Sequence, residues 1–126
     1  AMETAVTSGA KATLLAEAAA AHPQEACGLL LGRDGLIDQA RPVRNVHPDP
    51  QRHFELDPAA LIAAHRAARE GGPQVLGYYH SHPAGPARPS ATDQAEACGD
   101  GRIWAIVAGS AIGWWRDAPG GFERFP

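Results

Sequence analysis

The chain has 126 residues, 44% of them hydrophobic, and its formal net charge is −3. That length predicts one domain over residues 1–126 with a real core, and the slight negative charge argues against nucleic acid or an anionic membrane as the main partner, because both select for clustered Lys and Arg. No apolar run approaches the ~20 residues of a membrane span, and the first fifteen residues lack the basic start and apolar segment of a secretory signal.

Caps, turns and apolar periodicity divide the first part of the chain into a helix, a strand hairpin, a loop and a second helix. In chain order these elements are expected at residues 9–21, 25–32 with 36–43, 44–56 and 58–70. Ser8 is the expected cap of the first helix and Asp57 that of the second, because their side chains accept bonds from the free N–H groups of a first helical turn. Gly71 should end the second helix.

The second part predicts a strand, a proline-rich loop, a short helix and three more strands. In chain order they are expected at residues 74–82, 83–89, 90–98, 103–108, 112–117 and 121–125. Strands and helices that mix in this way are typical of an α/β or α+β domain, so we expect a mixed sheet covered by helices.

Two histidines, His80 and His82, lie one residue apart at the end of the strand predicted over residues 74–82. Residues two apart on a strand share a face, here roughly 7 Å apart at the backbone. Two imidazoles at that spacing can bind one ion, and Asp93 can add a carboxylate after the loop. Three such ligands leave a fourth tetrahedral position for water, which is typical of one catalytic zinc rather than a structural zinc.

Each part of this pattern also has an ordinary explanation. Six histidines in 126 residues give about 0.3 His-x-His pairs by chance. Ser90 and Asp93 have the spacing of a helix capping box, in which Ser caps and an acid follows three residues later. Requiring all four residues at their offsets lowers the chance estimate to about 0.0005, so the combination favours a metal site.

A hydrolytic zinc site also needs a proton acceptor that is not a ligand. Glu25 is the candidate, because it stands at the start of an otherwise apolar strand, where a carboxylate is costly without a role or a partner. Simple exposure at the strand's start explains Glu25 at least as well from this stretch alone. The remaining histidines show no such geometry and are expected to be solvent-facing or partly packed: His22, His47, His53 and His65.

The pattern of Glu25, then His80-Ser81-His82-Pro83, then seven residues from Pro83 to Pro89, then Ser90-x-x-Asp93 resembles the JAMM (MPN+) metalloprotease motif at every position. The stretches "EACGLLLG", "FELDP" and "GYYHSHP" also resemble compact bacterial members. The resemblance covers roughly residues 10–125. It implies a curved mixed β-sheet flanked by helices.

The resemblance also implies an activity and roles for particular residues. Family enzymes are zinc peptidases that cut peptide or isopeptide bonds at the C-terminal tail of ubiquitin or ubiquitin-like proteins. His80, His82 and Asp93 would bind the zinc, Glu25 would act as general base toward a zinc-activated water, and Ser90 would hydrogen-bond the developing oxyanion or the water. Ser81 would only position its strand. The loop at residues 44–54 is shorter than in eukaryotic deubiquitinating members, which favours a small bacterial enzyme acting on a ubiquitin-like or sulfur-carrier protein.

Three other functions remain open at this point. A non-catalytic scaffold of the same fold would bind partners without metal. A cysteine hydrolase would use Cys27, although this residue stands in an apolar run, where cysteines are usually inert. A zinc deaminase would need His-x-Glu together with Pro-Cys-x-x-Cys, and this combination does not occur. Cys27 and Cys98 form no disulfide framework, so a reducing cytoplasm is expected. Ala1 before Met2 is expected to be a cloning remnant.

Overall fold

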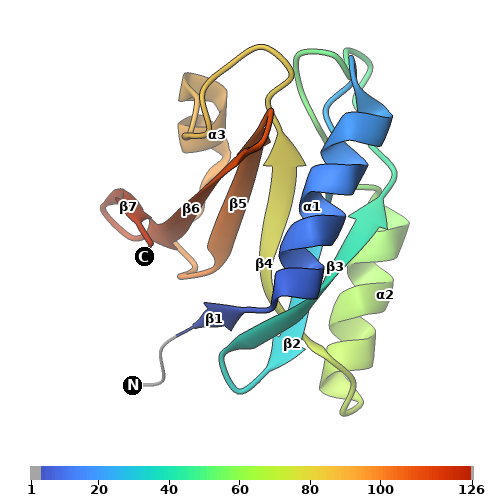
Figure 1. Cartoon of the computed structure of the whole chain (residues 1–126). Helices are drawn as coiled ribbons and strands as arrows, with labels where there is room; N and C mark the ends of the chain where they lie inside the picture. Colours follow the sequence, from blue (N-terminus) through green and yellow to red (C-terminus); the bar gives the residue numbers. More distant parts are fainter. Residues whose placement is uncertain (1–3, 126) are drawn as a thin grey trace.

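The computed structural model describes residues 4–125, which form one seven-stranded sheet with helices packed against it (Figure 1). The strands are β1 (Ala5–Val6), β2 (Cys27–Arg33), β3 (Leu36–Val43), β4 (Gln74–Ser81), β5 (Ile103–Ala108), β6 (Ala111–Ala118) and β7 (Gly121–Arg124). The helices are α1 (Ser8–Ala21), α2 (Pro58–Arg69) and α3 (Ala91–Glu96).

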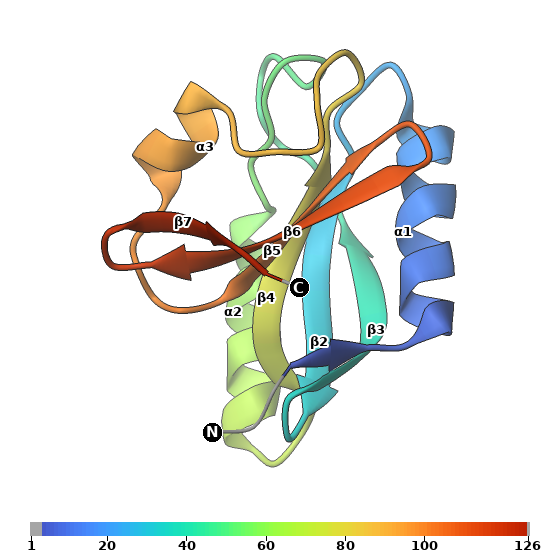
Figure 2. The ribbon, with the colours of Figure 1, turned by 60° about the vertical axis from the view of Figure 1, so that its left-hand side comes forward.

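The sheet is mixed, and its strand order is β1-β3-β2-β4-β5-β6-β7. β4 and β5 run parallel, as do β1 and β3, while the other neighbours are antiparallel. Figure 2 shows β6 and β7 crossing the direction of β2 and β4 at a steep angle, so the sheet is strongly curved. The expected mixed, curved sheet flanked by helices is confirmed.

β2 lies between two helical layers, because α1 and α2 lie on opposite sides of the sheet (Figure 2). Its buried residues alternate between the two sides, as the period of a strand requires. Leu30 packs in the cluster that contains Leu14 of α1, whereas Leu29 and Leu31 pack in the cluster that contains Ala64 of α2. This double burial explains the continuous apolar run of β2.

The structure corrects several element boundaries. The cap of α1 is Thr7 rather than Ser8, since the Thr7 side chain accepts a bond from the backbone N–H of Ala10 at 3.1 Å. The first strand of the hairpin begins at Cys27, which leaves Glu25 outside it, and α3 ends at Glu96, because Ala97 has extended backbone angles. Strand β1 was not predicted, because two residues carry no periodic pattern.

The hairpin turn between β2 and β3 follows the prediction. Asp34 and Gly35 both have positive φ, at 52° and 77°. Two such residues in succession match the twist of the flanking strands, and Asp-Gly is a preferred pair for this turn.

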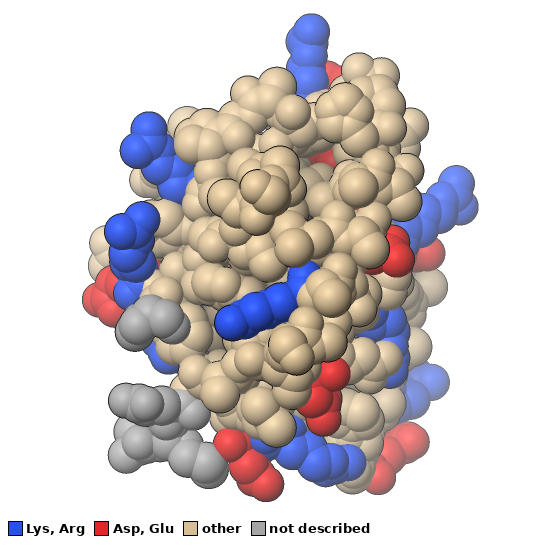
Figure 3. Space-filling view, viewed as in Figure 1, with Lys and Arg blue, Asp and Glu red and all other residues tan. Residues whose placement is uncertain are grey.

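No helix in residues 4–125 is long and apolar enough to cross a membrane. On the face shown in Figure 3, basic and acidic side chains are interspersed around a broad uncharged area. The charges on this face therefore form no continuous basic strip of the kind that follows a phosphate backbone.

Gly28 provides a test of the packing between β2 and its neighbours. A Cβ added there would collide with the carbonyl oxygen of Arg41 and the ring of Tyr79, so we expect Gly28→Ala to lower the free energy of unfolding by about 3 kcal/mol. Gly9→Ala is the matched control, because a Cβ there meets open space, and it should leave stability unchanged or raise it by up to about 1 kcal/mol. Urea denaturation of the metal-free proteins measures both, and equal stabilities would contradict this packing.

Candidate functional site

The end of β4 places two imidazoles side by side. Tyr79 packs in the cluster below α1, so its neighbours His80 and Tyr78 point to the other face of the sheet. His82 follows the last strand residue and is held by a bond from its backbone N–H to the carbonyl oxygen of Val107 at 2.8 Å. The Nε2 atoms of His80 and His82 lie 3.0 Å apart, and His80 is 1% exposed.

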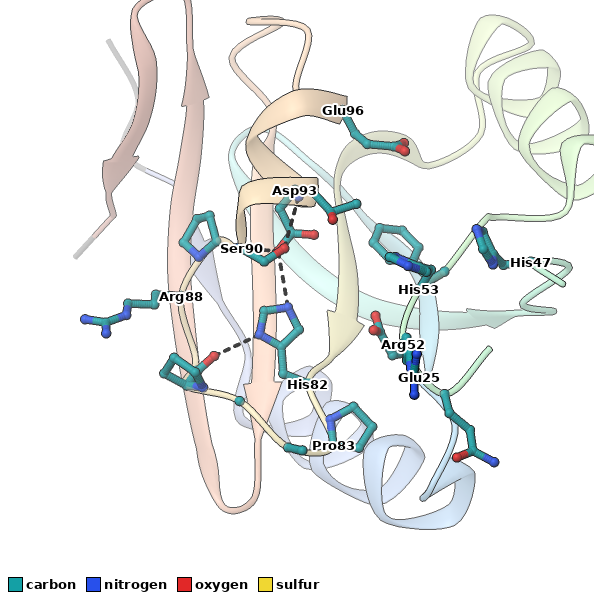
Figure 4. Close-up of a pocket in the computed structure, with 17 residues that line it drawn as sticks. Glu25, His47, Arg52, His53, His82, Pro83, Arg88, Ser90, Asp93 and Glu96 are labelled. Atoms are coloured by element: carbon teal, nitrogen blue, oxygen red, sulfur yellow. Dashed lines mark hydrogen bonds and ion pairs between the residues drawn. The ribbon is translucent and has the colours of Figure 1, made fainter. Parts of the chain in front are cut away.

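Asp93 reaches the two histidines from the first turn of α3. Its backbone N–H donates to the Ser90 hydroxyl at 3.0 Å, and its Oδ2 accepts from the backbone N–H of Ser90 at 2.9 Å, which completes a capping box. The same Oδ2 lies 3.1 Å from Nε2 of His80 and 3.2 Å from Nε2 of His82. Figure 4 shows His82, Ser90 and Asp93 meeting at one side of a cavity. The cap and the metal-site pattern are therefore one structure rather than alternatives.

The chemistry of this donor set fits a cation. Nδ1 of His82 lies 2.8 Å from the carbonyl oxygen of Pro86, which can only accept, so Nδ1 carries the proton. In neutral His82 the lone pair is then on Nε2 and faces the Asp93 carboxylate. Two lone pairs at this distance repel unless a proton or a metal ion lies between them. The ligand atoms of His80, His82 and Asp93 are close enough together to hold one metal ion, and two imidazole nitrogens with a carboxylate oxygen are a set that zinc accepts.

The same geometry sets the protonation of the three groups. Burial lowers the pKa of His80. Burial would also lower the pKa of His82, but its bonds to Asp93 and to the carbonyl of Pro86 outweigh burial and raise it. For Asp93, burial favours the neutral form, yet the bonds from His80 and His82 hold its pKa well below the usual range. A proton shared by His82 and Asp93 therefore competes with a metal ion for the same place.

Aromatic rings fix the orientation of His80. Phe54 stacks on the imidazole with ring centroids 4.3 Å apart and an interplanar angle of 18°, and Trp104 meets it edge-on at 5.8 Å. Metal-binding histidines usually donate their second ring nitrogen to a polar partner. Within the described part of the chain, Nδ1 of His80 has no hydrogen-bond partner, so ring packing takes over this orienting role.

Glu25 lies across the cavity from His82 and Asp93 (Figure 4). Its backbone N–H donates to the carbonyl oxygen of Pro50 at 2.7 Å. Burial raises the pKa of its carboxyl from 4.5 to about 7, with smaller opposing contributions from His82, which lowers it, and Asp93, which raises it. A carboxyl that titrates near neutrality inside a cavity suits proton transfer. Simple exposure, the other explanation of Glu25, is wrong, because the residue is 8% exposed.

Ser81 holds the backbone next to Glu25 in place. Its hydroxyl oxygen accepts a bond from the backbone N–H of Ala26 at 2.8 Å, and its own N–H donates to the carbonyl oxygen of Ala26 at 3.0 Å. These bonds join the start of β2 to the end of β4, where His80 and His82 lie. This agrees with the strand-positioning role that the resemblance implies for Ser81.

The cavity between these groups has a volume of about 510 Å³ and is walled by two loops. One wall is the proline-rich segment 83–89 and the other is the segment 47–54. Sequence patterns missed several residues of these walls: His47, Arg52, His53, Phe54 and Arg88. His47 and His53 are partly packed, as expected, but their place beside the site depends on how the loop folds back, and their spacing did not indicate it.

The two cysteines do not form a nucleophilic centre. Cys27 is buried, its Sγ lies 3.4 Å from the carbonyl oxygen of Val43, and burial together with the charge of Glu25 raises its pKa to about 12. A thiol in that state is not a nucleophile at neutral pH. The cysteine-hydrolase alternative therefore lacks its reactive group.

A second group of possible ligand atoms is formed by Cys98, Asp100 and Asp117. Both carboxylate oxygens of Asp117 already accept backbone N–H bonds, from Cys98 and Gly99 at 3.1 and 3.0 Å. Asp100 is paired with Arg102 at 2.9 Å. These bonds account for the carboxylates as anchors of the turn before β5.

Two curated relatives are similar to this chain. A desampylase from Haloferax volcanii is 37% identical over 72% of the chain, and a probable TtuB-protein conjugate cleaving protease from Thermus thermophilus is 44% identical over 69%. The matched segments span 67% and 55% of these relatives' own lengths.

Solved structures share the fold. A protein from Desulfitobacterium hafniense superposes with a TM-score of 0.81 and 34% identity, covering 94% of this chain and 87% of that one. A JAB1/MPN domain protein from Archaeoglobus fulgidus superposes with a TM-score of 0.67 at 22% identity, covering 98% and 97% of the two chains, and this likeness shows the fold alone.

The family described as prokaryotic homologs of the JAB domain matches residues 7–119, a span that includes Glu25, both histidines of β4 and its end, and the capping box of α3. The resemblance to the JAMM motif is thereby confirmed, and the chain belongs to this family of prokaryotic JAB-domain proteins.

Proposed function

We propose that this chain is a zinc-dependent peptidase or isopeptidase that cleaves at the C-terminal tail of a ubiquitin-like or sulfur-carrier protein. One observation carries the proposal: the convergence of His80, His82 and Asp93 on one point at the wall of a cavity that also contains Glu25. The printed activities of the relatives, a desampylase and a protease for TtuB-protein conjugates, support this substrate class.

Each residue has a proposed role that follows from its position. His80, His82 and Asp93 hold the ion, which when bound supplies a Lewis acid that polarises a carbonyl and lowers the pKa of water. The Glu25 carboxylate accepts a proton from the attacking water and passes it to the nitrogen of the leaving amine. The Ser90 hydroxyl accepts from the Asp93 N–H, so its own proton is free to donate to an oxygen that gains negative charge.

The cavity suits a short segment of chain. Its volume of about 510 Å³ is in the range of small-ligand sites, so it admits a few residues rather than a folded domain. Ala84 and Gly85 leave little side-chain bulk on the proline-rich wall. A tail of small residues in extended form would fit between the two walls.

The extent of the domain and the compartment are also proposals. We infer that residues 1–126 form one catalytic domain, because all the described strands join one sheet. We also infer a reducing cytoplasm, which is consistent with the two free cysteines. A neighbouring gene for a carrier protein with a Gly-Gly end would support the assignment of the substrate.

Glu25→Gln tests the general base. We expect the variant to keep stoichiometric zinc and to lose turnover of carrier fusions, because an amide cannot accept the proton. Since the pKa is raised in the folded state to about 7, ionised Glu25 destabilises the fold above that pH and not below 4.5. The metal-free variant should therefore be more stable than wild type by about 1–3 kcal/mol at pH 8, and equally stable near pH 4. Turnover at the wild-type rate would remove Glu25 from the mechanism.

Zinc titrations test the ligand set. We expect His82→Ala to weaken zinc binding by on the order of 100-fold or more, while His65→Ala, a histidine of α2 outside the cavity, leaves it unchanged.

The pKa of His82 is raised in the fold, so zinc binding should release a proton from His82. Zinc binding should therefore strengthen as the pH rises through the pKa of His82. Calorimetry in buffers of different ionisation enthalpy measures this release. Full zinc occupancy in His82→Ala would mean that the ligand set is wrong, and a wild-type protein without zinc would favour the scaffold alternative.

Ser90→Ala tests whether the Ser90 hydroxyl donates to the oxyanion in addition to capping α3. We expect kcat to fall by about 100- to 1,000-fold if the hydroxyl donates to the developing charge. Thr7→Ala is the matched control, because it removes the equivalent cap of α1 and costs about 0.5–2 kcal/mol of stability without touching the cavity. A kcat for Ser90→Ala within threefold of that for Thr7→Ala would mean that Ser90 caps the helix and does not donate to the oxyanion.

A further inference from the structure

Glu25 lies outside the sheet, so its position depends on bonds from elsewhere. β2 begins only at Cys27, and Glu25 precedes it. The bonds of Ser81 reach Ala26 and not Glu25. On the main chain of Glu25, the N–H donates to the carbonyl oxygen of Pro50 at 2.7 Å, and the carbonyl oxygen accepts from the Asn45 side chain at 3.1 Å. Both of these partners belong to the loop between β3 and α2.

Asn45 uses its whole side-chain amide in this loop. Its Nδ2 donates to the carbonyl oxygens of Glu25 and His53, at 3.1 and 3.0 Å. Its Oδ1 accepts from the backbone N–H groups of His47 and Glu55, both at 3.1 Å. An Asn side chain offers two donor protons and two acceptor lone pairs, so all four are used.

The loop that Asn45 closes also carries the ring that packs on His80. Main-chain bonds join Val46 to Glu55 at 2.9 Å and Asp57 to Arg44 at 3.1 Å, which brings the two ends of the loop together. Between these ends, Phe54 stacks on His80 and lines the cavity. A single amide therefore links the proposed base on one side of the cavity to the segment that orients a proposed ligand.

We propose that Asn45 is a positioning residue of the reaction, which holds Glu25 at its working place through the bond to the Glu25 carbonyl oxygen. This inference rests on the proposed function. It assigns Asn45 no contact with the substrate or the ion.

The Asn45→Asp variant removes the two bonds that Asn45 donates, to Glu25 and His53, and keeps the two that it accepts. It keeps an acceptor for His47 and Glu55, but it places a carboxylate oxygen where the donor faced the carbonyl oxygens of Glu25 and His53. Asn45→Ala removes all four bonds. Asp57→Ala is the matched control, because it removes a side-chain bond to the N–H of Ala59 at the end of the same loop and leaves Glu25 untouched.

The expected result is a fall in kcat of at least about 10-fold for Asn45→Asp, with KM and zinc affinity within about threefold of wild type. The kcat of Asn45→Ala should fall by at least as much. Asp57→Ala should keep its kcat within about twofold of wild type, although its loss of stability is similar to that of the Asn45 variants. A kcat of Asn45→Asp equal to that of Asp57→Ala, measured on zinc-loaded folded enzyme, would overturn the proposal, since a purely structural bond would lower stability alone.

Amide hydrogen exchange gives a readout that needs no substrate. We expect the Glu25 amide to exchange at least about 10-fold faster in Asn45→Asp than in Asp57→Ala. The reason is that the loop carrying Pro50, which accepts the bond from this amide, loses the bonds donated by Asn45. Equal protection in the two variants would overturn the positioning role. If the wild-type protein cleaves none of the carrier fusions, the proposed function fails, and the exchange rates still decide whether Asn45 holds Glu25.

Discussion

One carboxylate oxygen, Oδ2 of Asp93, organises the site. It accepts the N–H of Ser90, which fixes it at the start of α3, and it faces the Nε2 atoms of His80 and His82 at 3.1 and 3.2 Å. Since Nδ1 of His82 holds its proton toward Pro86, the Nε2 lone pair of neutral His82 faces this oxygen, and a proton or a metal ion between them removes the repulsion. Strand β4 supplies His80, and the crossover between β4 and β5 supplies His82 and Asp93.

Stability and activity make opposite demands on Glu25. Burial raises the pKa of its carboxyl to about 7. A pKa near neutrality is useful for moving a proton, but the buried carboxylate lowers the stability of the folded protein. The chain compensates on the main chain, where Pro50 and Asn45 bind the two sides of the residue. The proposed base thus lies in an unfavourable environment and is attached to the loop by two main-chain bonds.

The sequence predicted those parts of the fold and site that depend on local patterns. The hairpin of β2 and β3, its Asp-Gly turn and the pairing of His80 with His82 all follow from the period of a strand and from turn chemistry. What the sequence could not predict depends on contacts between distant segments. The stacking of Phe54 on His80, the four bonds of Asn45 and the strand β1 belong to this class.

The capping box also bears on how such proteins diverge. Ser90 and Asp93 stabilise the beginning of α3 whether or not an ion is present, because each bonds the other's backbone N–H. A descendant that gave up the histidines would still benefit from keeping this pair for its helix. A serine and an aspartate three residues apart can therefore be kept for the helix alone, so in a distant homologue this pair without the two imidazoles does not indicate a metal site.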